Sequence, residues 1–180
     1  MSVPAVFLDR DGVLNAARVV DARPYPPRTL DELQPLPGVD EACRRLREAG
    51  FSLIAVTNQP DIARGTQTLA AVRAMNERLE MLLGLDEVVV CPHDDADECE
   101  CRKPRPGMIL DAAKRWGVDL CRSVTVGDRW RDVEAGRRAG TRTVFIDRHY
   151  DERRPDGPDL TVNELLESIT WIIETAGSRN

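Results

Sequence analysis

The chain has 180 residues, with 25 Lys plus Arg against 31 Asp plus Glu and a formal net charge of −6. This length suits one domain with its own core, so a single domain over residues 1–180 is expected. The acidic balance, without a long basic cluster, argues against nucleic acid as a partner and favours a small molecule. No segment is long and apolar enough to cross a bilayer and the start has no basic leader, so a cytoplasmic, monomeric protein without membrane contact is expected.

Short apolar runs alternate with segments of helical periodicity along the chain. The predicted strands are 3–8, 51–56, 87–90, 123–126 and 143–146. The predicted helices are 39–49, 69–83, 108–116, 133–139 and a last one capped by Asn163. In helix 69–83 the residues expected to face the core are Leu69, Val72, Met75, Leu79 and Leu82. The proline-rich stretch 22–38 is predicted to be a long irregular loop.

This alternation indicates an α/β fold, with a mostly parallel sheet covered by helices on both faces. In such sheets ligands bind outside the carboxyl ends of the strands. Asp9 and Asp11 follow the first predicted strand, Thr57 follows the second and Asp128 follows the fourth. The pair Asp11-Gly12 alone would read as a turn, but polar groups from three strand ends are expected to converge on one edge.

Clustered carboxylates repel one another and need a compensating cation or a raised pKa. Asp9, Asp11 and Asp128 on one rim suit Mg²⁺, which prefers hard oxygen ligands. A carboxylate can also act as a covalent nucleophile towards phosphorus. With the Thr57 hydroxyl and a lysine nearby, the set meets the needs of phosphoryl transfer, in which fixed charges neutralise the phosphoryl oxygens.

Four ordered segments resemble the motifs of the haloacid dehalogenase superfamily of phosphatases. They are Asp9-Arg-Asp11-Gly12, Thr57-Asn58, Lys103, and Gly127-Asp128 with Asp132 four residues on. The resemblance covers roughly residues 3 to 147 and implies a Rossmann-like parallel sheet of strand order 5-4-1-2-3 without a cap domain.

The resemblance also implies roles for these residues. Asp9 would attack phosphorus, and Asp11 would protonate the leaving alcohol and then activate water. Thr57 and Lys103 would bind the transferring phosphoryl group. Mg²⁺ would sit on Asp9, the backbone carbonyl of Asp11, and Asp128, with Asp132 as outer-shell support.

Three thiols and an imidazole lie within residues 91–101: Cys91, His93, Cys99 and Cys101. A Cys₃His set is a known structural zinc composition, and reduced surface thiols are the alternative. Four ligands fill a tetrahedral shell, so zinc would order this loop and fix the Arg102-Lys103 segment that follows, without taking part in chemistry. Cys43 and Cys121 are interpreted as core filler.

The sequence CPH…CxCRKPxPGM resembles the zinc-loop subgroup of the superfamily, which holds heptose 1,7-bisphosphate 7-phosphatases and histidinol-phosphate phosphatases. The motif order is most similar to the former, which implies Mg-dependent removal of the 7-phosphate through an aspartyl-phosphate intermediate. Substrate is expected to meet Asn58, Gln59, Arg102 and Arg129, with 16–37 and 92–101 walling the site. Arg131, Arg137 and Arg138 are interpreted as a solvated helix face.

Two alternatives remain at this point. One is a phosphatase of the same chemistry that acts on histidinol phosphate or another small phosphomonoester. The other is an inactive zinc-stapled module that binds phosphorylated sugars or a partner enzyme. The presence of both Asp9 and Asp11 argues against the second alternative.

Overall fold

A central parallel sheet organises the chain in the computed structural model, which describes residues 2–177. Its strands follow the order β5-β4-β1-β6-β7-β8, and every neighbouring pair is parallel. Their bounds are β1 Ala5–Leu8, β4 Ser52–Asn58, β5 Glu87–Cys91, β6 Val124–Gly127, β7 Arg142–Ile146 and β8 Leu160–Val162. All six carboxyl ends therefore point to the same edge of the sheet.

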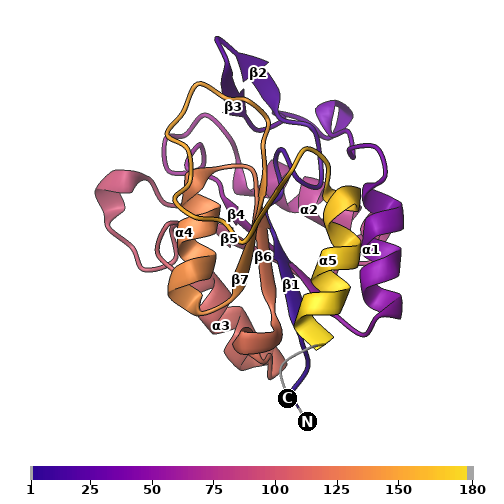
Figure 1. The fold of residues 1–180 in the computed structure, drawn as a ribbon. Coiled ribbons are helices and arrows are strands. Elements are labelled where there is room, and N and C mark those ends of the chain that lie inside the picture. Colours follow the sequence, from indigo (N-terminus) through magenta and orange to yellow (C-terminus); the bar gives the residue numbers. More distant parts are fainter. Residues whose placement is uncertain (1, 178–180) are drawn as a thin grey trace.

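Helices cover both faces of the sheet, as the sequence predicts (Figure 1). The helices are α1 Val39–Glu48, α2 Leu69–Leu83, α3 Gly107–Trp116, α4 Trp130–Ala139 and α5 Leu165–Gly177. One face packs against α1, α2 and α5, and the other against α3 and α4. In the described part of the chain, no helix combines the length and apolar composition needed to span a bilayer.

Alternation along β1 explains how one short strand serves two cores. Val6 and Leu8 belong to the core under α1, α2 and α5, whereas Ala5 and Phe7 belong to the core under α3 and α4. All four side chains are fully buried. A strand buried on both faces reads as a continuous apolar run, and this is why the sequence located it.

The sheet differs from the predicted five-strand order because it contains a sixth strand. Five of the strands neighbour one another as expected, but β8 adds an edge beside β7, where Val144 pairs with Leu160. This strand is three residues long and only half-buried. It has no apolar run of its own, and it is held by hydrogen bonds of Asp159 with Thr143 at its start.

The proline-rich stretch is not wholly irregular, which corrects the prediction for 22–38. β2 Arg18–Val20 pairs antiparallel with β3 Arg23–Tyr25, and a short 3₁₀ helix η1 covers Leu30–Glu32. Asp21 and Ala22 both have positive φ, as a two-residue hairpin turn requires. Pro24 is tolerated within β3 because each strand of a two-stranded ribbon keeps a free edge.

Helix α2 begins and ends where the sequence predicts, but two of its expected core residues are wrong. Val72, Met75 and Leu79 are buried, whereas Leu69 and Leu82 are 43% and 45% exposed. Leu83 is buried instead of Leu82. It lies four residues after Leu79 and so continues the buried stripe, whereas Leu82 falls on its flank.

Candidate active site

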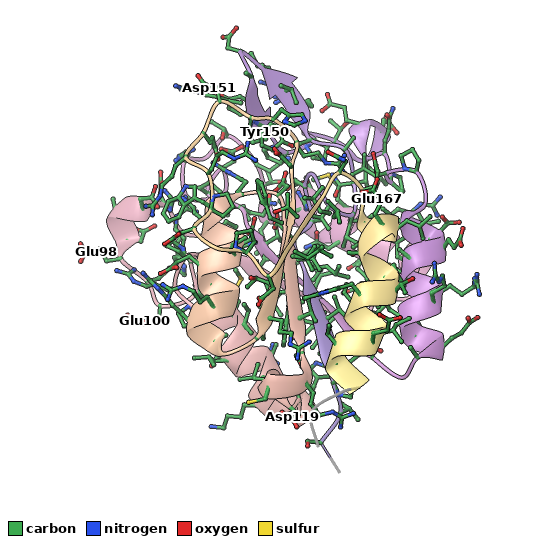
Figure 2. The ribbon with its side chains drawn as sticks, viewed as in Figure 1. Glu98, Glu100, Asp119, Tyr150, Asp151 and Glu167 are labelled. Carbon is green, nitrogen blue, oxygen red and sulfur yellow. The ribbon has the colours of Figure 1, made fainter. Side chains whose placement is uncertain are left out.

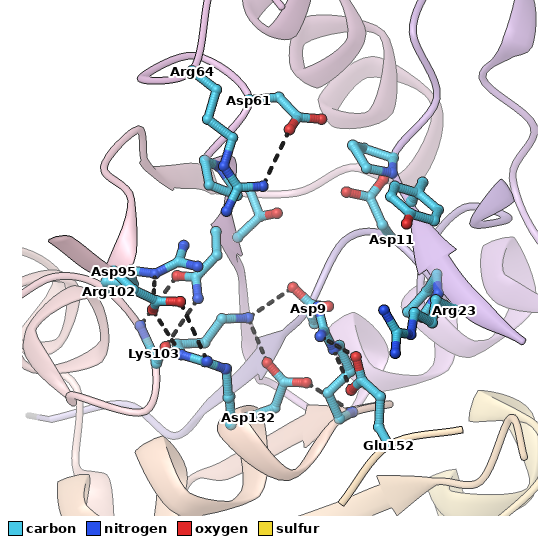
Figure 3. A pocket seen from close by; sticks show the side chains of 18 residues that line it. Asp9, Asp11, Arg23, Asp61, Arg64, Asp95, Arg102, Lys103, Asp132 and Glu152 are labelled. Carbon is cyan, nitrogen blue, oxygen red and sulfur yellow. Dashed lines mark hydrogen bonds and ion pairs between the residues drawn. The ribbon is translucent and has the colours of Figure 1, made fainter. Parts of the chain in front are cut away.

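The expected polar residues gather around one cavity at the carboxyl edge of the sheet (Figure 3). Asp9 directly follows β1, Thr57 lies near the end of β4, and Asp132 is the third residue of α4. The cavity has a volume of about 280 Å³, near the lower end of small-molecule sites. Its lining includes Asp9, Asp11, Arg23, Tyr25, Thr57, Asn58, Arg64, Asp95, Arg102, Lys103, Arg129, Arg131, Asp132 and Glu152.

Lys103 joins the distant parts of the site. Its ammonium nitrogen lies 2.7 Å from Asp9 Oδ1 and 2.6 Å from Asp132 Oδ1, and it donates to the Val56 carbonyl at 2.7 Å. All three charged side chains are almost fully buried. A buried ammonium with two carboxylates and a carbonyl has all its donors used, so its position is fixed before any ligand arrives.

The buried carboxylates are electrostatically strained. Burial raises the pKa of Asp9 to about 6, although Lys103 pulls it down. Burial, followed by Asp9 and Asp132, raises the pKa of Asp128 well above its usual range. The pKa of Lys103 is raised because Asp132 and Asp9 outweigh the opposing effect of burial. The carboxylates therefore outnumber the one ammonium, and a further cation would relieve their repulsion.

Asp128 provides the clearest sign that a cation belongs here. Neither of its carboxylate oxygens makes a hydrogen bond of ordinary geometry with a described residue, although the side chain is buried and interacts with the Tyr150 hydroxyl. One oxygen each from Asp9, Asp128 and Asp132 lie within 4.8 Å of one another. Gly12, with φ +91°, permits this approach, because a Cβ there would lie 1.8 Å from Asp128 Oδ2. The hard oxygen donors of this carboxylate cluster fit a magnesium-like ion.

Asp11 is held apart from this carboxylate cluster. Arg10 donates to both of its oxygens, at 3.1 and 2.9 Å, and Asn15 and Gln59 donate at 2.9 and 2.8 Å. Arg10 is fully buried and also donates to Asn76. Figure 3 shows Asp11 and Lys103 on opposite sides of Asp9. Sequence reasoning missed Arg10 and Asn15 as site residues, although both lie inside the first motif.

Asn58 and Gln59 have different surroundings. Asn58 lines the cavity and clamps the backbone of Lys103, donating to its carbonyl at 3.0 Å and accepting from its N–H at 3.1 Å. Gln59 is buried and is not among the lining residues. Its amide nitrogen donates to Asp11 and to the Thr57 hydroxyl. Gln59 therefore lies outside the cavity lining, where contact with substrate was expected.

The cavity wall is rich in arginine. Arg129 pairs with Glu152, and its N–H donates to Asp132 Oδ2 at 3.0 Å. Arg102 donates from Nε to Asp95 at 2.7 Å. Arg131 also lines the cavity, which corrects its placement on a solvated helix face. Its position one residue before Asp132 is the only sequence signal that points to it.

Segments 16–37 and 92–101 wall the site, as expected. Arg23 and Tyr25 come from the β2–β3 hairpin and Asp95 comes from the short 3₁₀ helix η2 at Asp95–Asp97. The hairpin is tied to the loop after β7 by a hydrogen bond from the Asp151 N–H to the Ala22 carbonyl, at 2.9 Å. Figure 2 shows Asp151 and Tyr150 at this end of the molecule, with Asp119 at the opposite end.

A second cluster, here called the Cys/His cluster, comprises Cys91, His93, Cys99 and Cys101. Its ligand atoms lie 3.2–3.6 Å apart in the recorded pairs. That is too far for a disulfide and close to the spacing of about 3.8 Å expected around tetrahedral zinc. Burial raises the pKa of Cys91 and of Cys101, so a cation would be needed to hold both as thiolates.

The two cysteines outside the Cys/His cluster differ in burial. Cys43 is fully buried in the core under α1, as expected for core filler. Cys121 is exposed, so its interpretation as core filler is wrong. It lies in the short 3₁₀ helix η3 at Leu120–Arg122, which carries no buried residue. Its place just before an apolar strand suggested a buried position, but β6 begins three residues after it, at Val124.

Comparison with known proteins identifies the class. The family model of haloacid dehalogenase-like hydrolases matches residues 15–140, more than half of the chain. The chain belongs to this family. Of the four motif residues, Asp9, Thr57 and Lys103 line the cavity, and Asp128 lies beside it in the carboxylate cluster with Asp9 and Asp132.

Particular relatives are more specific. The chain is 41% identical to a D-glycero-beta-D-manno-heptose-1,7-bisphosphate 7-phosphatase of Pseudomonas aeruginosa over 151 residues, covering 81% of this chain and 82% of that one. It is 38% identical to the protein of the same name from Yersinia pestis, covering 92% and 93%. A crystal structure of D,D-heptose 1,7-bisphosphate phosphatase from B. bronchiseptica, complexed with magnesium and phosphate, superposes with a TM-score of 0.79. It is 32% identical and covers 95% of this chain and 98% of that one.

Proposed function

We propose that this chain is a magnesium-dependent phosphatase that removes the 7-phosphate of heptose 1,7-bisphosphate. The observation that carries the proposal is Lys103, buried between Asp9 and Asp132 in the same group of carboxylates as the buried Asp128. This arrangement supplies a carboxylate nucleophile, a fixed positive charge and hard metal ligands at one cavity. The proposed substrate is the one given in the names of the relatives above, and this chain aligns with most of the length of each.

The reaction proceeds in two displacements. Asp9 Oδ attacks the phosphorus, the bond from phosphorus to the sugar oxygen breaks, and Asp11 gives its proton to that oxygen. A water then attacks the phosphorus of the aspartyl phosphate, Asp11 takes the proton of this water, and Asp9 leaves with inorganic phosphate released. Each proton that Asp11 gives in the first step is thus recovered in the second.

The other side chains hold the reactants. Lys103 and the Thr57 hydroxyl face the oxygens of the transferring phosphoryl group and stabilise the charge that develops there. Arg10, Asn15 and Gln59 hold Asp11 at a fixed place until the sugar oxygen arrives. Asn58 fixes the backbone that carries Lys103.

The residues fit Mg²⁺ at the carboxylate cluster. Asp9, Asp128 and the backbone carbonyl of Asp11 would hold the ion, which supplies charge neutralisation to the phosphoryl oxygens when bound. Asp132 acts from further out, because Lys103 and the Arg129 N–H already engage its two oxygens.

Zinc is proposed at the Cys/His cluster. Three soft thiolates and an imidazole complete a tetrahedral shell and leave no position for substrate. When bound there, zinc would order residues 91–101 within one catalytic domain spanning residues 1–180, and Cys101 would hold the Arg102-Lys103 segment that begins directly after it. Its contribution to catalysis is the placement of Lys103.

A phosphate-release assay with Mg²⁺ tests the proposal. Both anomers of heptose 1,7-bisphosphate are compared with histidinol phosphate and with simple sugar monophosphates. The highest kcat/KM is expected on the heptose bisphosphate. A preference for histidinol phosphate would replace the substrate but keep the chemistry. No turnover of any of these compounds by metal-loaded protein would overturn the enzyme and favour a binding module.

A further inference from the structure

Two arginines of the cavity wall share one carboxylate. Arg102 Nε donates to Asp95 Oδ1 at 2.7 Å, and Arg131 donates to Oδ1 and Oδ2 at 3.0 and 3.5 Å. The three residues come from three different places: the segment after the Cys/His cluster, the first turn of α4, and η2. Figure 3 shows Arg102 and Asp95 together on the wall beyond Lys103.

The charges in this trio do not balance. Two guanidinium groups face one carboxylate, so the trio carries one net positive charge. The Arg102 and Arg131 side chains are 10% and 26% exposed, whereas Asp95 is 57% exposed. The cations are therefore enclosed and the anion is open to solvent. Releasing Asp95 to water costs little, because its carboxylate is already largely hydrated.

The arginines are held in place without Asp95. Arg102 also donates to the His93 carbonyl at 3.2 Å, and the Arg131 guanidinium lies 5.0 Å from the centre of the Trp130 ring. Two pre-oriented guanidinium forks provide the bidentate donors that suit a phosphate. A phosphate dianion in place of Asp95 would balance both positive charges.

The trio lies directly beside the reacting centre. Arg102 precedes Lys103 and Arg131 precedes Asp132, and Lys103 and Asp132 are themselves ion-paired at 2.6 Å. Consecutive residues lie about 3.8 Å apart along the backbone. The two chain segments that build the phosphoryl site therefore also build the arginine pair, and both line one cavity.

We propose that Arg102 and Arg131 together bind the second, non-reacting phosphate of the substrate, and that Asp95 occupies their site until this phosphate displaces it. Arg131 is thus a specificity residue, and Asp95 is a built-in competitor of the substrate. The inference rests on the proposed function. It adds a second guanidinium to the expected contact of Arg102, and it explains why the wall holds an exposed acidic residue at a site that must accept an anion.

The test compares KM on heptose 1,7-bisphosphate with KM on heptose 7-phosphate, the same sugar without the second phosphate. Arg131→Ala is expected to raise KM for the bisphosphate about tenfold to a hundredfold and to leave KM for the monophosphate unchanged. Arg131→Lys should recover part of the loss, because it keeps the charge without the fork. Equal effects on both substrates, or no effect on either, would overturn the role of Arg131.

A matched control is available on the same helix. Arg137→Ala removes the same charge from α4, but Arg137 is exposed, pairs with Glu134 and does not line the cavity. It should leave both KM values unchanged. A rise in KM for the bisphosphate alone with Arg137→Ala, equal to that with Arg131→Ala, would show a general charge effect and overturn the site.

Asp95→Asn tests the competitor directly. The variant is expected to lower KM for the bisphosphate by about two- to fivefold and to leave the monophosphate unchanged. An unchanged or higher KM for the bisphosphate would overturn the competitor role of Asp95.

A binding measurement separates this inference from the proposed function. Calorimetry with the Asp9→Asn protein compares binding of the bisphosphate and the monophosphate without turnover. Preference for the bisphosphate that disappears with the added Arg131→Ala supports the arginine site even where the unsubstituted protein shows no phosphatase activity. Equal binding of both sugars to Asp9→Asn would overturn the inference, and turnover of the bisphosphate by the unsubstituted protein would still support the proposed function.

Discussion

The carboxylate cluster and the Cys/His cluster are assembled in opposite ways. Asp9, Asp128 and Asp132 come from strand ends and a helix that lie far apart in the sequence, and only the folded sheet brings them together. The four residues of the Cys/His cluster all come from 91–101. The carboxylate cluster borders the cavity, whereas four soft ligands would close the shell of the other.

This difference separates chemistry from folding. A cluster that depends on the whole sheet is positioned by the large core, so replacing one carboxylate should change the reaction and leave the fold. A cluster formed within one loop has little core of its own, so removing one ligand should first release the loop. The predictions below test this separation, from the largest expected effect to the smallest.

Asp9→Asn should abolish turnover and keep the fold. The substitution removes the attacking oxygen's charge but almost no volume, so kcat should fall on the order of 10⁴-fold or more while the melting temperature stays close to that of the unsubstituted protein. Phosphate release and thermal unfolding measure the two. Asp111→Asn, on the exposed side of α3, is the control and should keep full activity. Retained turnover with Asp9→Asn would refute the nucleophile.

Cys99→Ser should reduce stability and activity together. Losing one ligand from the Cys/His cluster frees the loop, and we expect the free energy of unfolding to fall by about 2–5 kcal/mol. Unfolding curves, phosphate release and elemental analysis for zinc measure the effect. Cys121→Ser is a matched control, because Cys121 is exposed and outside the cluster. Absence of zinc from reduced, freshly purified protein would contradict the assignment.

Asn58→Ala should lower activity through Lys103. The two hydrogen bonds between the Asn58 amide and the Lys103 backbone are lost, so the ammonium loses part of its fixed position. We expect kcat to fall about tenfold with a small change in stability. Steady-state kinetics checks this, with Asn163→Ala at an exposed position as control. An increase in KM without a fall in kcat would indicate that Asn58 binds substrate instead.

The sequence located the buried parts of the fold well, because burial leaves a pattern. β1 is apolar at every position, and α2 repeats apolar residues along one stripe, so both were found. β8 is short and half-buried and leaves no such pattern. The β2–β3 hairpin contains Pro24, which local rules exclude from strands, yet a two-stranded ribbon accepts it.

The sequence predicts a site residue only where the residue type and its place in an ordered motif indicate the chemistry. Asp9, Thr57 and Asp128 could be placed at one edge because parallel strands end there, and Lys103 was expected beside them from the family resemblance. Arg131 and Asp95 could not, since an arginine on an amphipathic helix and an aspartate in an acidic loop both read as solvated. Their contact depends on how α4 and the loop 91–101 pack, and this is a property of the tertiary structure.

The smallest effect is expected from Arg64→Ala, which tests whether a surface ion pair couples the Cys/His cluster to the carboxylate cluster. Arg64, in the loop after β4, donates to both oxygens of Asp94 at 2.6 and 2.8 Å and so links that loop to the segment that carries the Cys/His cluster. The Arg64 side chain is about half exposed, and exposed ion pairs contribute little. If the Cys/His cluster acts through the continuous Arg102-Lys103 segment, breaking this surface link should leave the zinc content intact and change kcat by less than about threefold. The double variant Arg64→Ala, Asp94→Ala should behave like either single variant. Because Arg64 also lines the cavity and Asp94 does not, Asp94→Ala decides the cause. A fall in kcat with Asp94→Ala as large as that from Asn58→Ala would show that the surface pair, and not the covalent segment, couples the loop of the Cys/His cluster to the reacting lysine.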